Sequence, residues 1–138
     1  MSATTTSGFH GAKPTIADLA LKLSEGGRFD IHWTAIRGFA DWVRRHPDEL
    51  EEAVRRGPEP IGNPLDALLA SFTEELCDTH GVDRPQWTAA VPPLEKKWEP
   101  PGTPRMLQQA RRDTPKTFRV RNLTLARSVL FREARRSS

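Results

Sequence analysis

The residues whose chemistry could support a metal site are few, and one pair has a suitable spacing. Cys77 and His80 lie three positions apart in a predicted helix, so both side chains would point to the same side. A zinc site needs three or four ligands, and the other histidines, at positions 10, 32 and 46, provide no second pair. The pair therefore predicts a buried cysteine beside a histidine at a helix end, with no metal and no cofactor.

Patterns typical of catalysis are equally weak. Cys77 as a nucleophile would need a lowered pKa and a positioned base, and the neighbouring Asp78 disfavours a thiolate. Glu74 and Glu75 are adjacent on a helix and point in different directions, which does not suit a paired acid and base. The sequence contains no GxxxxGK[ST], GxGxxG or GxSxG motif. We therefore expect that the protein is not an enzyme.

The charge of the chain is divided unevenly along its length. Residues 1–95 carry 9 Lys and Arg against 15 Asp and Glu, whereas residues 96–138 carry 12 against 3, and the formal net charge is +3. Such asymmetry predicts an acidic partner for the basic part, or docking of the basic part on the acidic one.

The basic part contains the predicted binding residues. Guanidinium groups suit phosphate or carboxylate, and the interleaved Phe118 and Phe131 would stack on bases. An acidic protein surface and a nucleic acid are both consistent with this pattern, and Arg127 and Arg132 are expected to be solvated. The residues predicted to bind a partner or nucleic acid are Arg105, Arg111, Arg112, Lys116, Arg119 and Arg121.

A central helix, predicted at 64–80, must hold these side chains in place. Its apolar residues recur at helical spacing, as Leu65, Leu68, Leu69, Phe72 and Leu76. Asn63 is expected to cap this helix, with Pro64 at the first helical position. Gly81 is expected to end the helix in the left-handed conformation.

Shorter helices are predicted before the central one. The first begins at a capping box formed by Thr15 and Asp18 and ends at Gly26, and the others cover about 31–45 and 48–56. Residues 15–45 could form a helix-turn-helix, but apolar side chains occupy the positions where its second helix should read bases. That face therefore predicts core packing.

Prolines dominate the chain after residue 90. The segment 91–104 is expected to wrap over the bundle, pinned by Leu94 and Trp98. Trp87 and Trp98 are predicted to pack together over the end of helix 64–80, and with Phe118 they form the predicted structural set.

The basic part is expected to be mostly helical. Thr103-Pro104 and Thr114-Pro115 are each typical of a helix start and predict two short helices, at about 104–111 and 115–118. Residues 118–121 alternate and are expected to be extended. A last basic helix, about 124–135, should bury Ala126, Val129 and Leu130.

Size and composition agree with a small intracellular domain. With 36% hydrophobic residues and 12 prolines, 138 residues suit one modest core. A single cysteine is typical of the reducing cytoplasm, and no apolar run suggests a signal peptide or a membrane helix. We therefore predict an all-α cytoplasmic protein with a disordered 1–13 and a single domain over 14–138. Its parts are acidic (14–95) and basic (96–138), and its oligomeric state stays open.

Three segments resemble one known group of proteins. PLDALLASFTEELCDTHGVDRPQWT, the Trp98-Glu-Pro100 element and RRDTPKTFRVRNLTLARSVLFR are similar to the C-terminal region of actinobacterial antitoxin-like proteins. Those proteins are Xre-type regulators paired with nucleotidyltransferase-like toxins. The most specific matches are Arg84-Pro85 with Trp87-Thr88, and Thr114-Pro115 with Phe118, Arg119 and Arg121.

The resemblance covers roughly residues 35–135. It implies a helical module that binds and neutralises a toxin protein encoded nearby. Residues 1–34 are too short for an Xre domain, so DNA binding is not implied. The alternative function, from the arginines alone, is a nucleic-acid-binding transcriptional regulator.

Overall fold

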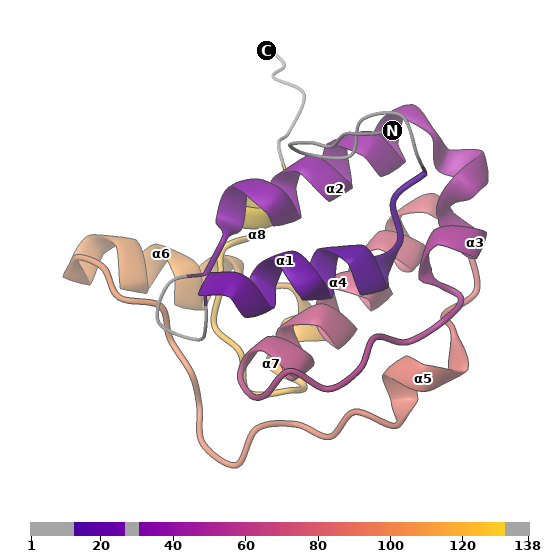
Figure 1. The fold of residues 1–138 in the computed structure, drawn as a ribbon. Coiled ribbons are helices and arrows are strands. Elements are labelled where there is room, and N and C mark those ends of the chain that lie inside the picture. The colour runs from indigo at the N-terminus through magenta and orange to yellow at the C-terminus, as the bar shows by residue number, and fades with distance from the viewer. Residues whose placement is uncertain (1–12, 27–30, 132–138) are drawn as a thin grey trace.

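A computed structural model describes residues 13–26 and 31–131, and it is built from helices (Figure 1). In these ranges the one β feature is an isolated parallel bridge between Trp98 and Leu123. The elements are α1 (Ile16–Gly26), α2 (Trp33–Arg45), the 3-10 helix η1 (Pro47–Glu49), α3 (Leu50–Val54), α4 (Leu65–His80), α5 (Gln86–Ala89), α6 (Pro104–Asp113), α7 (Lys116–Arg119) and α8 (Arg127–Leu130). The predicted all-α fold is confirmed. The predicted disorder of residues 1–13 lies outside the described part except at Lys13, which is exposed and pairs with Glu49 at 3.1 Å.

Helix α4 lies at the centre of the fold. The five apolar residues of its predicted stripe are all buried, and Ala67, Ala70 and Cys77 bury further sides of the same helix. The helices α1, α3, α5 and α7 all contact it. The ring of Phe72 lies 6.2 Å from Phe39 of α2 and 5.5 Å from Phe131 after α8. One core therefore includes residues from both the acidic and the basic part.

The two ends of α4 differ in how well the sequence predicted them. At the C-terminal end, Gly81 adopts a φ of 70° and its N–H bonds to the carbonyl of Cys77, as expected. At the N-terminal end the predicted Asn63 cap is wrong, because no side chain caps the helix there. The carboxylate of Asp66 instead accepts the N–H groups of Ile61 and Gly62 at 2.8 and 3.1 Å.

The N-terminal helices follow the prediction closely. Thr15 and Asp18 form the reciprocal capping box, with bonds of 3.0 and 3.1 Å. The apolar face of α2 is in the core rather than free to read bases, as its sequence predicted. Its buried residues are Ile36, Phe39, Ala40 and Val43.

The proline-rich segment wraps over the fold as predicted, and backbone bonds fix it at two points. The N–H of Leu94 donates to the carbonyl of Arg121 at 3.1 Å, and the amide of Asn122 returns a bond of 2.6 Å to the carbonyl of Leu94. Trp98 exchanges backbone bonds with residues 122 and 124, of 2.8 and 2.9 Å. These hydrogen bonds hold the segment between α5 and α6 against residues 121–124.

The predicted pairing of the two tryptophans is not what the contacts show. The indole Nε1 of Trp87 donates to the carbonyl of Val54 at 2.8 Å, and its ring packs against Gly57. Trp98 instead forms the bridge with Leu123. Trp87 therefore fixes α5 to the end of α3, whereas Trp98 fixes the wrapping segment to the C-terminal part.

Of the two predicted helix caps in the basic part, only one is observed. Thr103 caps α6 by accepting the N–H of Met106 at 3.2 Å, as expected. Thr114, however, does not cap α7: its hydroxyl donates to the carbonyl of Ala110 and accepts the N–H of Leu125. These two bonds join the C-terminal end of α6 to the segment before α8.

The last two elements differ from the prediction in different ways. Residues 116–119 form α7 and are followed by a turn, so the extended conformation expected over 118–121 is wrong. Helix α8 begins only at Arg127 and ends at Leu130, because Phe131 is extended. Residues 132–135 of the predicted last helix lie outside the described ranges. Ala126 and Leu130 are buried, and Val129 is half-buried.

Candidate interaction surface

Arg121, predicted to bind a partner, is instead buried, and only 6% of it is exposed. Its guanidinium forms a two-bond ion pair with Glu74 of α4, at 2.8 and 3.1 Å. It also donates to the carbonyls of Thr88 and Val91 at 2.6 and 3.2 Å, and to the hydroxyl of Ser71 at 3.3 Å. Its prediction as a binding residue is corrected, because its donors are used inside the fold.

The electrostatics of Glu74 agree with this internal role. Burial by itself raises the pKa of Glu74, but the hydrogen bonds and charge of Arg121 outweigh burial and hold the pKa below its ordinary value. Arg84 lies 3.6 Å from the same carboxylate and pairs with Asp78 at 2.6 Å. Arg84 and Thr88 of the Arg84-Pro85 and Trp87-Thr88 motif therefore both contact this buried ion pair.

Two more arginines of the basic part bond within the chain. Arg127, expected to be solvated, pairs with Glu75 at 3.2 Å and lies 4.5 Å above the ring of Phe131. Arg111 is largely exposed but forms a two-bond pair with Glu99, at 2.6 and 2.8 Å. Docking of the basic part on the acidic one, which the charge asymmetry allowed, therefore accounts for Arg121 and Arg127.

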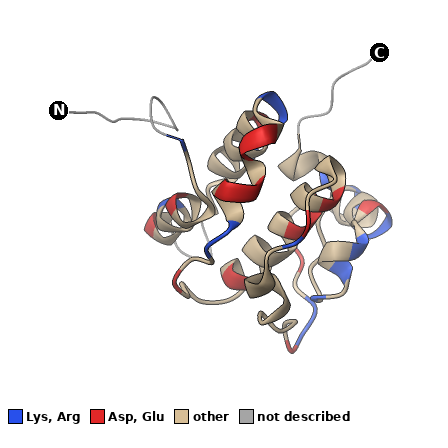
Figure 2. Cartoon of the chain, turned by 90° about the vertical axis from the view of Figure 1, so that its right-hand side faces the viewer, with Lys and Arg blue, Asp and Glu red and all other residues tan. Residues whose placement is uncertain are grey.

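The other four predicted binding residues form the candidate surface. Arg105, Arg112, Lys116 and Arg119 are exposed, and none of them forms an ion pair with an acidic residue within 13–26 and 31–131. They lie on α6 and α7, two helices joined only by Thr114 and Pro115. Figure 2 shows the basic and acidic residues coloured along the cartoon of the chain. We call these four residues, together with Met106 and Val120, the α6–α7 surface.

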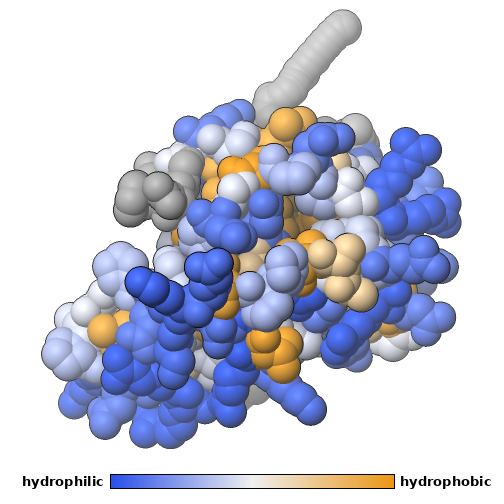
Figure 3. Space-filling model, turned by 90° about the horizontal axis from the view of Figure 1, so that it is seen from below, coloured by the Kyte–Doolittle hydropathy of each residue, from blue (hydrophilic) through white to orange (hydrophobic). Residues whose placement is uncertain are grey.

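Two exposed apolar residues lie on the same two segments as these cations. Met106 and Val120 are 58% and 55% exposed, and they follow Arg105 and Arg119 directly in the chain. Leu21 on α1 is the other large apolar side chain exposed to this degree among the described residues. Seen from below, the lower-left part of the molecule is hydrophilic and is interrupted by small hydrophobic patches (Figure 3). Mixed cationic and apolar character is typical of a protein interface.

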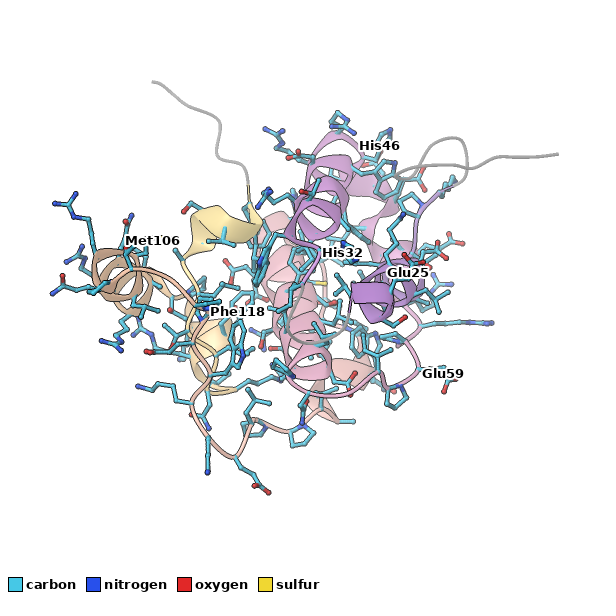
Figure 4. All side chains as sticks on the ribbon, turned by 60° about the vertical axis from the view of Figure 1, so that its left-hand side comes forward. Glu25, His32, His46, Glu59, Met106 and Phe118 are labelled. Carbon is cyan, nitrogen blue, oxygen red and sulfur yellow. The ribbon has the colours of Figure 1, made fainter. Side chains whose placement is uncertain are left out.

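The aromatic residues expected to stack on bases are not available. Phe118 is fully buried, as its structural role predicted, and Phe131 is only 8% exposed. Figure 4 shows Phe118 in the interior and Met106 on the outlying helix α6. The stacking mode of single-strand binding therefore has no aromatic platform at these two positions.

Two further exposed cations were not among the predicted binding residues. Lys96 and Lys97 are exposed on the wrapping segment, between its pins at Leu94 and Trp98. Their position in a proline-rich segment was a signal of exposure.

The Cys77 and His80 pair has no metal-binding partners in the described ranges, where no group of three or more His, Cys, Asp or Glu could hold an ion. Cys77 is fully buried. Burial, followed by the charge of Asp78, raises the pKa of its thiol to about 11. A thiol that stays protonated at neutral pH is a poor nucleophile.

A small pocket lies beside α5, away from the cationic residues of α6 and α7. It has a volume of about 240 Å³ and is lined by Trp87, three prolines, Ala90 and Val91, with Asn63 and Asp66 as its polar residues. Asp66 already accepts two backbone N–H groups. The pocket brings together no pair of catalytic groups.

Comparison with known proteins adds no identity to this geometry: no family model, characterised protein or solved structure matches the chain. In the described part of the chain, no helix is long and apolar enough to cross a membrane.

Proposed function

We propose that this protein is a non-enzymatic interaction module that binds and neutralises a partner protein in the manner of an antitoxin, through the α6–α7 surface. The observation that carries the proposal is the group of four exposed cations without acidic partners in the described chain, beside exposed Met106 and Val120. Charged groups without counter-ions steer an oppositely charged partner, and apolar groups among them supply the desolvated contact.

The class of partner follows from charge and from the resemblance. A surface rich in arginine and lysine suits an acidic cleft, and the metal-binding pocket of a nucleotidyltransferase is rich in carboxylates. The similarity of residues 35–135 to antitoxin-like proteins supports a toxin of that type, encoded nearby, as the partner. Oligomerisation is not required by this surface.

The test is co-expression of the full chain with the product of the neighbouring gene. The expected results are a co-purifying complex and rescue of growth when the neighbour is toxic. Lys116→Glu with Arg119→Glu should weaken the complex, whereas Arg55→Glu with Arg56→Glu, which makes the same change in charge on exposed residues after α3, should not. Failure of both co-purification and rescue with the unmodified chain would contradict the proposal.

A second candidate, a nucleic-acid-binding regulator, is favoured by the same unpaired cations. Its signature is a steep loss of affinity for duplex DNA as salt increases, because each neutralised phosphate releases counter-ions. A flat salt profile, or no retention at low salt, would exclude this candidate.

A further inference from the structure

Helix α6 differs from the other long helices in how it is placed. It extends away from the body of the molecule (Figure 1), and Ala110 is its one buried residue. Leu107 is half-buried one turn before Ala110, so these two residues define the side that faces the body. The rest of the circumference of α6 faces outward.

The outward side of α6 has a regular composition. Arg105, Gln108, Gln109 and Arg112 follow one another at i, i+3, i+4 and i+7, and all four are exposed. This spacing places them on one stripe of a helix, opposite the side of Leu107 and Ala110. The stripe presents two guanidinium groups and two amides, which together form a long row of hydrogen-bond donors.

The position of this stripe is fixed at three places along the helix. Thr103 caps the first turn at 3.2 Å, and Arg111 bonds twice to Glu99 of the wrapping segment. Thr114 joins the last turn to Leu125 at 2.9 Å. A helix held in this way loses little further freedom on binding, which favours affinity.

We propose that α6 is the recognition helix of the interaction module, and that it inserts into a carboxylate-lined groove of a partner protein. Arg105 and Arg112 pair with carboxylates of the groove, Gln108 and Gln109 bond to its backbone or side chains, and Met106 fills an apolar site at its edge. Arg111 positions the helix through Glu99 and does not contact the partner. This inference rests on the proposed function and identifies which part of the α6–α7 surface carries it.

A protein groove fits the surface better than a DNA groove. Met106 lies at the edge of the stripe with more than half of its area exposed, and methionine adapts well to an apolar protein pocket.

The experiment uses the full chain with the product of the neighbouring gene and compares three paired variants. Arg105→Glu with Arg112→Glu reverses the charge of the stripe and should weaken the complex about 100-fold, the usual effect of losing two central arginine contacts. Arg105→Lys with Arg112→Lys keeps the charge but loses the two-bond geometry, and should weaken it about 10-fold. Arg55→Glu with Arg56→Glu is the matched control, because α3 and α6 lie at opposite ends of the molecule (Figure 1).

The outcomes separate the inference from the proposed function. Unchanged affinity in the Arg105→Glu, Arg112→Glu variant, with loss in Lys116→Glu, Arg119→Glu, would overturn the recognition helix but leave the interaction module intact. No complex with the unmodified chain overturns both. Binding of a 20-base-pair duplex that depends on Arg105 and Arg112, without any protein complex, overturns the protein groove in favour of DNA. Circular dichroism and thermal melting of each variant establish that it is folded.

Discussion

Replacing Arg121 by methionine should lower the free energy of unfolding far more than any substitution on the α6–α7 surface. Methionine has a similar length and fills a similar volume, so the change removes the charge and the donors without opening a large cavity. Five hydrogen bonds of 2.6 to 3.3 Å are lost at once. Two of these bonds belong to Glu74, whose carboxylate then stays buried without its main partner.

The size of the effect follows from that carboxylate. Removing one partner of a buried ion pair costs about 3–5 kcal/mol, because the other charge remains uncompensated. Arg84 lies 3.6 Å from Glu74 and supplies part of the missing compensation. We therefore expect about 3 kcal/mol, a large share of the roughly 5–15 kcal/mol that stabilises a typical domain.

Equilibrium unfolding in urea measures this loss as a lower midpoint with an unchanged slope. Arg119→Met is the matched control, since Arg119 is exposed two residues earlier and should change stability by less than about 0.5 kcal/mol. Adding Glu74→Leu to Arg121→Met removes the orphaned charge, and the double variant should recover part of the loss.

A small loss of stability in Arg121→Met would contradict the buried ion pair. If Arg121→Met lowers the free energy of unfolding by less than about 1 kcal/mol, or by no more than Arg119→Met does, the guanidinium is not a buried member of the ion pair. Arg121 would then be free to contact a partner, as the sequence pattern first suggested.

Three further predictions test other parts of the fold. The pKa of Glu74 is held below its ordinary value of 4.5, so its stabilising contribution is present above pH 4.5 and is lost as the pH falls through the lower folded-state pKa. The stability of the Glu74→Leu, Arg121→Met variant, followed by circular dichroism, should therefore fall less steeply with decreasing pH than that of the unmodified chain. Gly57→Ala would place a Cβ 2.8 Å from the Trp87 ring and should lower the free energy of unfolding in urea by about 1–3 kcal/mol. Gly38→Ala in α2, whose new Cβ would have no atom within 4 Å, should instead raise it by about 0.5–1 kcal/mol. Equal effects would show that Trp87 does not pack on Gly57. Because burial raises the pKa of Cys77 to about 11, a thiol reagent at pH 8 should label the folded protein far more slowly than the urea-unfolded chain, and equally fast labelling would contradict the buried position.

The helices of the acidic part could be predicted because their signals are local. The capping residues Thr15 and Asp18 bond to one another within a single turn. The apolar stripe of α4 recurs at helical spacing along one segment, and Gly81 ends that helix by its own backbone conformation. None of these features depends on which distant segment packs against the helix.

The errors lie where a distant partner decides the structure. Thr114-Pro115 has the local pattern of a helix start, yet the hydroxyl of Thr114 bonds to Leu125, eleven residues later. The stretch 118–121 alternates as a strand would, but Phe118 is drawn into the core formed with α4, and the chain turns after it. The error at Asn63 is local instead: it precedes proline as a cap would, but the carboxylate of Asp66, three residues later, accepts the N–H groups of Ile61 and Gly62.

The basic residues show most clearly what a sequence pattern cannot separate. Arg119 and Arg121 have the same chemistry and lie two positions apart, yet one is exposed and the other is 6% exposed and bound to Glu74. The difference is set by Glu74, which lies 47 positions earlier on α4, the helix against which α5 and α7 pack. A resemblance that includes both arginines therefore combines a residue that holds the fold with one available to a partner. Substitutions at Arg121 would lower stability whether or not a partner binds, so only exposed positions such as Arg105, Arg112 and Arg119 can show where the proposed partner docks.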